Sequence, residues 1–189
     1  MRKRTLVCFF IWPVVSMVYY GLSMKSDILG GDLYVNFIMG GFIEMPAILI
    51  IHLTIDRIGR QPLLIGGYTL TGLCLLSNLV VPADAVPYIS LAQLLLSKAA
   101  ITATYTVLYA FSSELFPTTI RNTAMGFCST FARIGAITAS FITMWIVDEY
   151  GRHFMIIPFG ILTVLAALAI LLILPETMGK PLPESIQEV

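Results

Sequence analysis

Three ionisable residues interrupt long apolar stretches of this sequence. Glu44 lies in FIEMPA, Lys98 in SKAAIT and Arg133 in FARIG, each near the centre of its stretch. A charge at the centre of a membrane span costs about 2.5 to 3.5 kcal/mol on insertion scales, so it normally faces a bundle interior or a wet cavity and often marks a solute pathway. The three residues together carry one net positive charge, which favours a substrate carboxylate. The alternative is a structural network in which Glu44 pairs with Lys98 or Arg133.

Aromatic and hydroxyl side chains accompany these charges at helical spacing. Lys98, Thr102, Tyr105 and Tyr109 recur at i, i+4, i+7 and i+11, so they share one helix face. Aromatic rings can hold an ammonium group through cation–π attraction. We therefore predict that Thr102 and Tyr105 contribute to a substrate site.

The first apolar stretch carries a similar stripe, in which Trp12, Ser16, Tyr19 and Ser23 follow the same spacing. We predict that Trp12 and Tyr19 also contribute to the substrate site. The alternative for all these rings is core packing, or a place in an interfacial belt near the ends of spans.

The elements that must position these residues are membrane helices. Hydrophobic residues make up 58% of the 189 and charged residues only 12%, whereas soluble domains carry about 25% charge. A bilayer core about 30 Å thick requires roughly 20 apolar residues per helix, and six such stretches occur, at about 5–24, 33–53, 63–81, 87–111, 122–147 and 153–174. They are apolar all round and lack the alternation of barrel strands. We predict an all-α membrane protein with six transmembrane helices in residues 1–175 and a cytoplasmic tail at 176–189.

The distribution of Lys and Arg predicts the orientation of the bundle. Seven of these residues fall on one side, namely Arg2, Lys3, Arg4, Arg57, Arg60, Arg121 and Lys180. Only Lys25 and Arg152 fall on the other. By the positive-inside rule both termini are cytoplasmic. We expect an integral membrane protein of the plasma membrane, with the lipid bilayer as its surroundings.

Several loop motifs resemble one transporter family. SSELFPTTIRNTAMG at 112–126, DRIGR at 56–60 and PETMGKPLPES at 175–185 are similar to cytoplasmic signatures of the organic cation, carnitine and organic anion transporters. YYGLS at 19–23 and GGDLYVN at 30–36 extend the similarity over essentially the whole chain. The resemblance implies the major facilitator fold, in which two six-helix halves rock about a site at the bilayer midplane. The six spans would then be helices seven to twelve, and the partner would be a missing N-terminal six-helix half or a second copy.

Within that family the charges suggest a subclass. Arg133 in FARIG looks similar to carriers of anions and carnitine, whereas Glu44 in FIEMPA resembles the cation and carnitine carriers. The resemblance therefore implies a small organic ion as substrate, and the two signs together favour a carnitine-like zwitterion. Arg133 and Lys98 would take its carboxylate, and Glu44 with the tyrosine rings would lie near its ammonium group.

The charged residues of the predicted cytoplasmic side suggest a gating latch between helix bundles. Its members would be Asp56, Arg57, Arg60, Glu114 and Arg121. A carboxylate near a helix N-terminus is stabilised by about 0.3 to 1 kcal/mol when exposed. Such a latch would form in one access state and break in the other. The alternative for Arg57 and Arg60 is simple positive-inside anchoring.

Other function classes find less support in the sequence. There is no Gly-rich phosphate loop, no HExxH and no plausible Ser/His/Asp set, so we expect no enzyme activity. The formal net charge is zero, and we expect no nucleic-acid partner. No metal or organic cofactor is implied, although a coupling ion, Na⁺ or H⁺, is compatible with the sequence. Two alternatives stay open: a sugar porter of the same superfamily, and a truncated or half-length chain that does not transport and acts as an interaction partner.

Overall fold

The chain folds almost entirely into helices. A computed structural model describes residues 2–24, 33–80 and 87–179. Its elements are α1 (Arg2–Met24), α2 (Leu33–Ile58), α3 (Arg60–Val80), α4 (Pro87–Leu115), α5 (Arg121–Phe141), the π-helical turn η2 (Ile142–Ile146), α6 (Val147–Tyr150) and α7 (His153–Ile173). The segment from α5 to α6 forms one span, Arg121–Tyr150, so six helices are long and apolar enough to cross a membrane. The predicted all-α class with six spans is confirmed.

Two helices continue beyond the apolar stretches from which they were predicted. The predicted spans end at 53 and 111, but α2 reaches Ile58 and α4 reaches Leu115. Hydropathy reports only the part of a helix that suits lipid, whereas backbone hydrogen bonding continues into polar residues such as Asp56 and Glu114. These extra turns carry three of the five residues of the predicted latch, Asp56, Arg57 and Glu114. Of the predicted tail, residues 180–189 lie outside the described residues.

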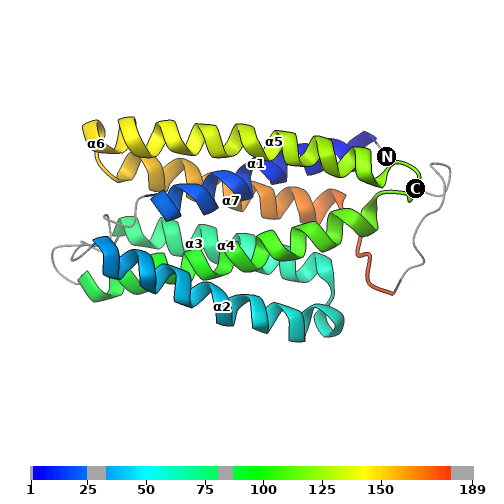
Figure 1. Cartoon of the computed structure of the whole chain (residues 1–189), viewed down its shortest axis with the longest axis horizontal. Helices are drawn as coiled ribbons and strands as arrows, with labels where there is room; N and C mark the ends of the chain where they lie inside the picture. The colour runs from blue at the N-terminus through cyan, green and yellow to red at the C-terminus, as the bar shows by residue number, and fades with distance from the viewer. Residues whose placement is uncertain (1, 25–32, 81–86, 180–189) are drawn as a thin grey trace.

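The helices run side by side along the long axis of the molecule, with α5 and α2 at opposite edges in Figure 1. α1 packs against α5, α7 and α4, α3 packs against α7 and α4, and α2 packs against α4. Large side chains fill the centre, including the fully buried Trp12, Tyr68, Phe111 and Phe159. α1 and α4 therefore occupy central positions, which is where the aromatic stripes of the sequence lie.

A glycine lets α1 and α5 approach closely. A Cβ placed on Gly135 would collide with the backbone carbonyl of Pro13, which lies within α1. Small residues at such crossings allow van der Waals contact between helix backbones in membranes. The Tyr68 hydroxyl also donates a 2.8 Å hydrogen bond to the carbonyl of Ile11. The region around Pro13 is thus held from both α5 and α3.

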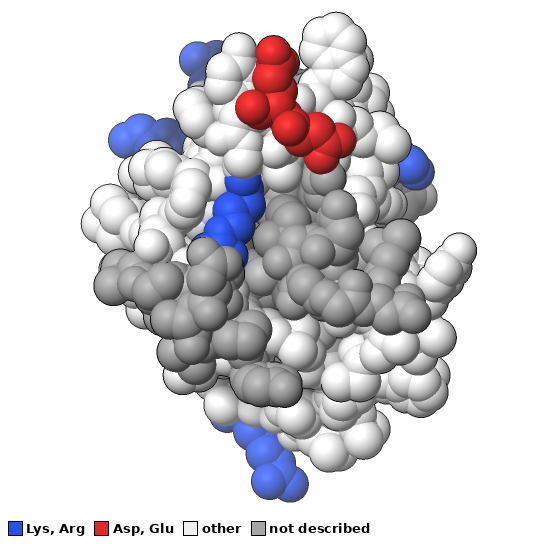
Figure 2. Space-filling model, turned by 90° about the vertical axis from the view of Figure 1, so that its left-hand side faces the viewer, with Lys and Arg blue, Asp and Glu red and all other residues white. Residues whose placement is uncertain are grey.

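The two ends of the bundle differ in charge. One end, seen in Figure 1, holds the start of α1, the turn between α2 and α3, and the connection between α4 and α5. It is the end predicted to be cytoplasmic. The opposite end carries an acidic patch, shown in Figure 2, where α6 contributes the exposed Asp148 and Glu149.

Candidate functional site

Two of the three mid-span charges pair with each other. Nζ of Lys98 on α4 lies 3.4 Å from Oε1 of Glu44 on α2, and the two side chains are only 10% and 19% exposed. Burying an ion pair costs desolvation energy, which is offset when further hydrogen bonds satisfy the charged groups. The pairing predicted as a structural alternative is therefore present.

Further contacts surround this ion pair. The Tyr19 hydroxyl on α1 donates to Oε2 of Glu44 at 3.3 Å, so both carboxylate oxygens have a partner. Nζ of Lys98 lies 5.9 Å from the ring centroid of Phe37, within cation–π range. Gly40 leaves room for the lysine, because a Cβ there would lie 2.7 Å from Nζ. Three helices, α1, α2 and α4, thus converge on the pair.

An aromatic cluster, defined as Trp12, Tyr19, Tyr105 and Tyr109, continues from the ion pair along α1 and α4. Tyr105 stacks on Tyr109 with ring centroids 5.5 Å apart, and Tyr19 meets Tyr105 edge-on at 5.8 Å. Trp12 lies edge-on to Tyr105 at 6.2 Å and to Tyr109 at 4.7 Å. Edge-to-face and offset-stacked pairs of this kind are each worth about 0.5 to 1.5 kcal/mol beyond burial. The two stripes predicted from spacing therefore meet at one place.

The members of the aromatic cluster differ in how far they are exposed. Tyr109 is 47% exposed, whereas Trp12 is fully buried and its Nε1 donates to Oγ of Ser112 at 3.0 Å. Trp12 is therefore placed to support the tyrosine rings from behind rather than to contact a solute directly. Thr102 is buried as well, and its hydroxyl donates to the carbonyl of Lys98 in its own helix at 2.9 Å.

Arg133 lies apart from the Glu44–Lys98 pair. It is an exposed residue of α5, and no ion pair or hydrogen bond joins its side chain to another of the described residues. The charge at the middle of this bundle is thus divided into a nearly buried neutral pair and one exposed guanidinium. That guanidinium presents a planar fork of donors suited to a carboxylate.

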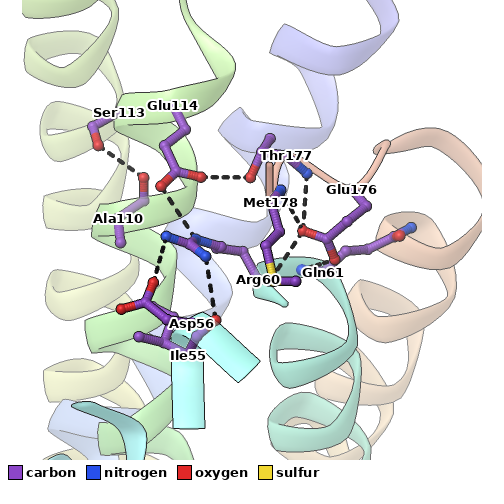
Figure 3. Close-up of polar contacts among 10 residues, drawn as sticks. All are labelled: Ile55, Asp56, Arg60, Gln61, Ala110, Ser113, Glu114, Glu176, Thr177 and Met178. Carbon is purple, nitrogen blue, oxygen red and sulfur yellow. Dashed lines mark hydrogen bonds and ion pairs between the residues drawn. The ribbon is translucent and has the colours of Figure 1, made fainter. Parts of the chain in front are cut away.

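A second polar cluster lies where α2, α3 and α4 meet the segment after α7 (Figure 3). We call it the end network, and its members are Asp56, Arg60, Glu114, Glu176 and Thr177. Arg60 at the start of α3 is its centre. Its Nη2 lies 2.9 Å from Oδ1 of Asp56, its Nε lies 3.1 Å from Oε1 of Glu114, and its Nη1 donates to the Ile55 carbonyl at 3.3 Å. The other oxygen of Glu114 accepts a 2.6 Å hydrogen bond from the Thr177 hydroxyl. The segment after α7 is therefore tied to both α3 and α4.

Glu176 caps the N-terminus of α3 within the end network. Its two carboxylate oxygens accept hydrogen bonds from the backbone N–H groups of Arg60 (3.1 Å) and Gln61 (3.0 Å). A helix N-terminus has unpaired N–H groups and a partial positive charge, so it stabilises a carboxylate. Gly59 makes room for this carboxylate with a positive φ of 104°, where a side chain would be strained and would meet Glu176.

The predicted latch is only partly assembled. Asp56, Arg60 and Glu114 come together, while Arg57 is exposed and has no hydrogen bond or ion pair among the described residues. Arg121 also stays outside the network, and its Nε and Nη2 are buried without a hydrogen-bond partner in the described part of the chain. The sequence pattern did not identify Glu176 and Thr177 as members, although both belong to the motif PETMGKPLPES at 175–185.

The sequence also missed two residues beside the candidate substrate site. Ser112 continues the α4 stripe at the same spacing, three residues after Tyr109, so helical periodicity could have identified it. Phe37 carries no such signal, because most of its neighbours in the span are apolar as well.

Comparison with known proteins gives a consistent assignment. The family model described as "Sugar (and other) transporter" matches residues 8–189. An organic cation transporter protein of Drosophila melanogaster is 40% identical over 188 residues, and solute carrier family 22 member 15 of Xenopus tropicalis is 40% identical over 196 residues. Each alignment covers all of this chain, but 34% and 36% of the relative. The chain thus spans about a third of the length of the curated relatives that it matches.

Solved structures agree on the fold. The inward-open xylose transporter XylE from E. coli is 25% identical, with a TM-score of 0.66 over 89% of this chain and 40% of that one. A peptide transporter, POT, is 15% identical with a TM-score of 0.73, over 94% of this chain and 39% of the other. The six helices therefore match part of a larger transporter fold.

Proposed function

Because the chain belongs to the sugar (and other) transporter family, we propose that it is the C-terminal half of a carrier with the major facilitator fold. The carrier moves small organic ions across a membrane by alternating access between two six-helix halves. The second half, from the same polypeptide or from a second copy of this chain, completes the solute site at the midplane. The end network lies at one end of the bundle, where it could open and close with the access state.

The chemistry of the midplane favours an ion over a sugar. Neutral sugars are held by hydrogen bonds and leave the charge of Arg133 unmatched, and a charge at this depth is expensive without a partner. Relatives at 40% identity carry names that specify organic cation transport. Both observations support organic ions as the substrate class and make the sugar-porter alternative less favourable.

The division of charge supports a zwitterion. Glu44 and Lys98 neutralise each other, so the exposed Arg133 is the charged group that remains to bind an anionic ligand. The tyrosines of the aromatic cluster offer ring faces and edges to an ammonium group, and Tyr19 connects them to Glu44. A carnitine-like molecule carries both required groups.

The exposed guanidinium of Arg133 is the observation on which the zwitterion proposal depends, and uptake by the complete carrier tests it. Hydrogen bonds to charged groups are worth about 1.5 to 3 kcal/mol, so Arg133→Gln should raise the KM for carnitine about tenfold to a hundredfold. The KM for a quaternary ammonium ion without a carboxylate should change little. Arg57→Gln, which removes an exposed arginine at the bundle end, is the matched control. An equal rise in the KM for both substrates in Arg133→Gln would show that Arg133 is a structural residue.

The alternative of a half-length protein without transport has its own test. An antibody against residues 176–189 reports the apparent size of the protein in its native membrane. A species about three times as long as this chain would support the carrier. A species of 20.8 kDa that takes up no organic ion would favour an interaction partner.

A further inference from the structure

Basic side chains gather where α1 and α5 begin, at the end of the bundle predicted to be cytoplasmic. The two helices pack against each other and begin at the same end (Figure 1). Their contacts advance together, from Phe9 with Phe131 to Pro13 with Gly135. The helices are therefore parallel, and their first turns lie side by side. The four basic residues of these turns, which we call the basic corner, are Arg2, Lys3, Arg4 and Arg121.

Arg121 lies on the face of α5 that packs against α1. It precedes the buried residues Cys128, Gly135 and Ala139 by 7, 14 and 18 positions, which is the spacing of one helix face. Its Nε and Nη2 are buried and have no hydrogen-bond partner in the part of the chain that the structure describes. Buried charged donors are costly to leave unpaired, and such a group commonly indicates a missing partner.

The described acidic residues do not supply that partner. At this end of the bundle they are Asp56, Glu114 and Glu176, and all three already bind Arg60, Thr177 or the start of α3 in the end network. The first turns of α1 and α5 contain no acidic residue, and no side chain caps the start of α5. A helix N-terminus adds a partial positive charge. The basic corner therefore lacks an anion among the described residues.

Apolar side chains are exposed next to the basic corner along α1. Leu6 is 68% exposed and Phe10 is 37% exposed, and with Lys3 they recur at i, i+3 and i+7 on one face. Phe10 and Tyr19 are nine positions apart, which at about 100° per residue places them on opposite sides of the helix. Because Tyr19 binds Glu44 beside the candidate substrate site, the face with Leu6 and Phe10 is turned away from that site.

We propose that the basic corner binds the headgroup of an anionic phospholipid, with phosphatidylserine as the lipid to test first. Guanidinium groups and helix N-termini both bind phosphate, and the exposed Leu6 and Phe10 lie where the acyl chains of the same lipid would pass. Clusters of roughly 4 to 8 Lys and Arg residues at the cytoplasmic end of a membrane helix are typical of sites for anionic lipids. The bound lipid would bridge α1 and α5.

This lipid site is separate from the candidate substrate site. It lies at the bundle end, whereas Glu44 and Lys98 lie near the middle of their helices. Lipid binding does not depend on which organic ion the carrier moves. The lipid proposal and the proposed function can therefore fail independently.

The test measures thermal unfolding of the complete protein in detergent during titration with short-chain phosphatidylserine. Short-chain phosphatidylcholine has the same acyl chains with a zwitterionic headgroup, and inorganic phosphate is an anion without acyl chains. A ligand that binds only the folded protein raises Tm by mass action. We expect a saturable rise in Tm with phosphatidylserine and a much smaller rise with either of the other two ligands.

Two variants assign the binding to the basic corner. Arg121→Gln and Lys3→Gln should each weaken the apparent affinity for phosphatidylserine about fivefold, which is the contribution of one basic residue near an anionic membrane surface. Arg57→Gln is the matched control, because Arg57 is an exposed arginine at the same end but belongs to α2, which packs against α4. This control should leave the affinity unchanged.

Each outcome decides the proposal. A preference for phosphatidylserine that weakens in Lys3→Gln and persists in Arg57→Gln supports the lipid site, even if Arg121→Gln does not fold. An equal loss of affinity in Arg57→Gln would overturn it in favour of the general charge of this end. An equal rise in Tm with phosphatidylcholine, or with inorganic phosphate, would also overturn it, because a specific anionic lipid would then not be required.

Discussion

Nζ of Lys98 and Oε1 of Glu44 lie 3.4 Å apart, so the opposite mid-span charges of α4 and α2 neutralise each other within one six-helix bundle. Insertion of either charge alone into lipid is costly. The pair thus gives the bundle a neutral centre and leaves the exposed Arg133 as the group available to an external anion.

Removing one member of this pair should destabilise the protein more than removing both. Glu44→Gln leaves Lys98 as an uncompensated charge, and Lys98→Met does the same to Glu44. We expect each single variant to lose about 1 to 3 kcal/mol of unfolding free energy. The double variant should recover part of that loss. Thermal unfolding of all four proteins gives the coupling energy, and purely additive effects would show that the ion pair contributes nothing.

The ring of Tyr105 should contribute more than its hydroxyl to the uptake of an ammonium ion. Tyr105→Phe keeps the stacking on Tyr109, whereas Tyr105→Ala removes a face that could hold an ammonium group. Cation–π contacts are worth about 0.5 to 2 kcal/mol, so Tyr105→Ala should weaken uptake of a quaternary ammonium ion by roughly 2- to 30-fold. Competition uptake assays measure this ratio. If Tyr105→Phe has the same effect as Tyr105→Ala, the hydroxyl rather than the ring is responsible.

The carboxylate of Glu176 should stabilise the start of α3. Glu176→Ala removes both hydrogen bonds to the N–H groups of Arg60 and Gln61. Loss of a helix cap costs about 0.5 to 2 kcal/mol, and Tm should fall accordingly. Glu149→Ala on α6, an exposed acidic residue at the other end of the bundle, serves as the control. An equal fall in Tm in both variants would show that the change in net charge, rather than the loss of the helix cap, is responsible.

The contact between α1 and α5 should not tolerate a side chain at Gly135. Gly135→Ala places a Cβ against the Pro13 carbonyl and should cost about 1 to 3 kcal/mol through overpacking. Gly126→Ala on the same helix is the control, because no atom lies within 4 Å of the added Cβ there. We expect Gly126→Ala to be neutral or slightly stabilising, since alanine favours helices. A stable Gly135→Ala variant would show that the two helices can separate without loss.

Hydropathy was enough to predict the six spans, because each helix must satisfy its own backbone in lipid and does so within one apolar stretch. Helical spacing also predicted which residues of α4 share a face, and Tyr105 and Tyr109 do stack. These properties are local, so a single sequence contains them.

The partners of the charges could not be predicted in the same way. Spacing within α4 does not show whether Lys98 meets Glu44 or Arg133, because that depends on how α2, α4 and α5 are arranged around α1. Glu176 was missed for a related reason. It is separated from Arg60 by 116 positions in the sequence, and only the packing of α7 against α3 brings the two together.

The π-helical turn Ile142–Ile146 affects how this chain can be aligned with its relatives. A π turn holds about one residue more than an α turn, so it accommodates the equivalent of a one-residue insertion without rotating Arg121–Phe141 relative to Val147–Tyr150. Deleting one residue between Ile142 and Ile146 would tighten the turn to α-helix and keep both flanking segments in register. A one-residue gap in an alignment at this point is therefore compatible with an unchanged fold. The same gap at Gly135 would rotate all following side chains of the helix by one residue position, so that those packed on α1 would face elsewhere.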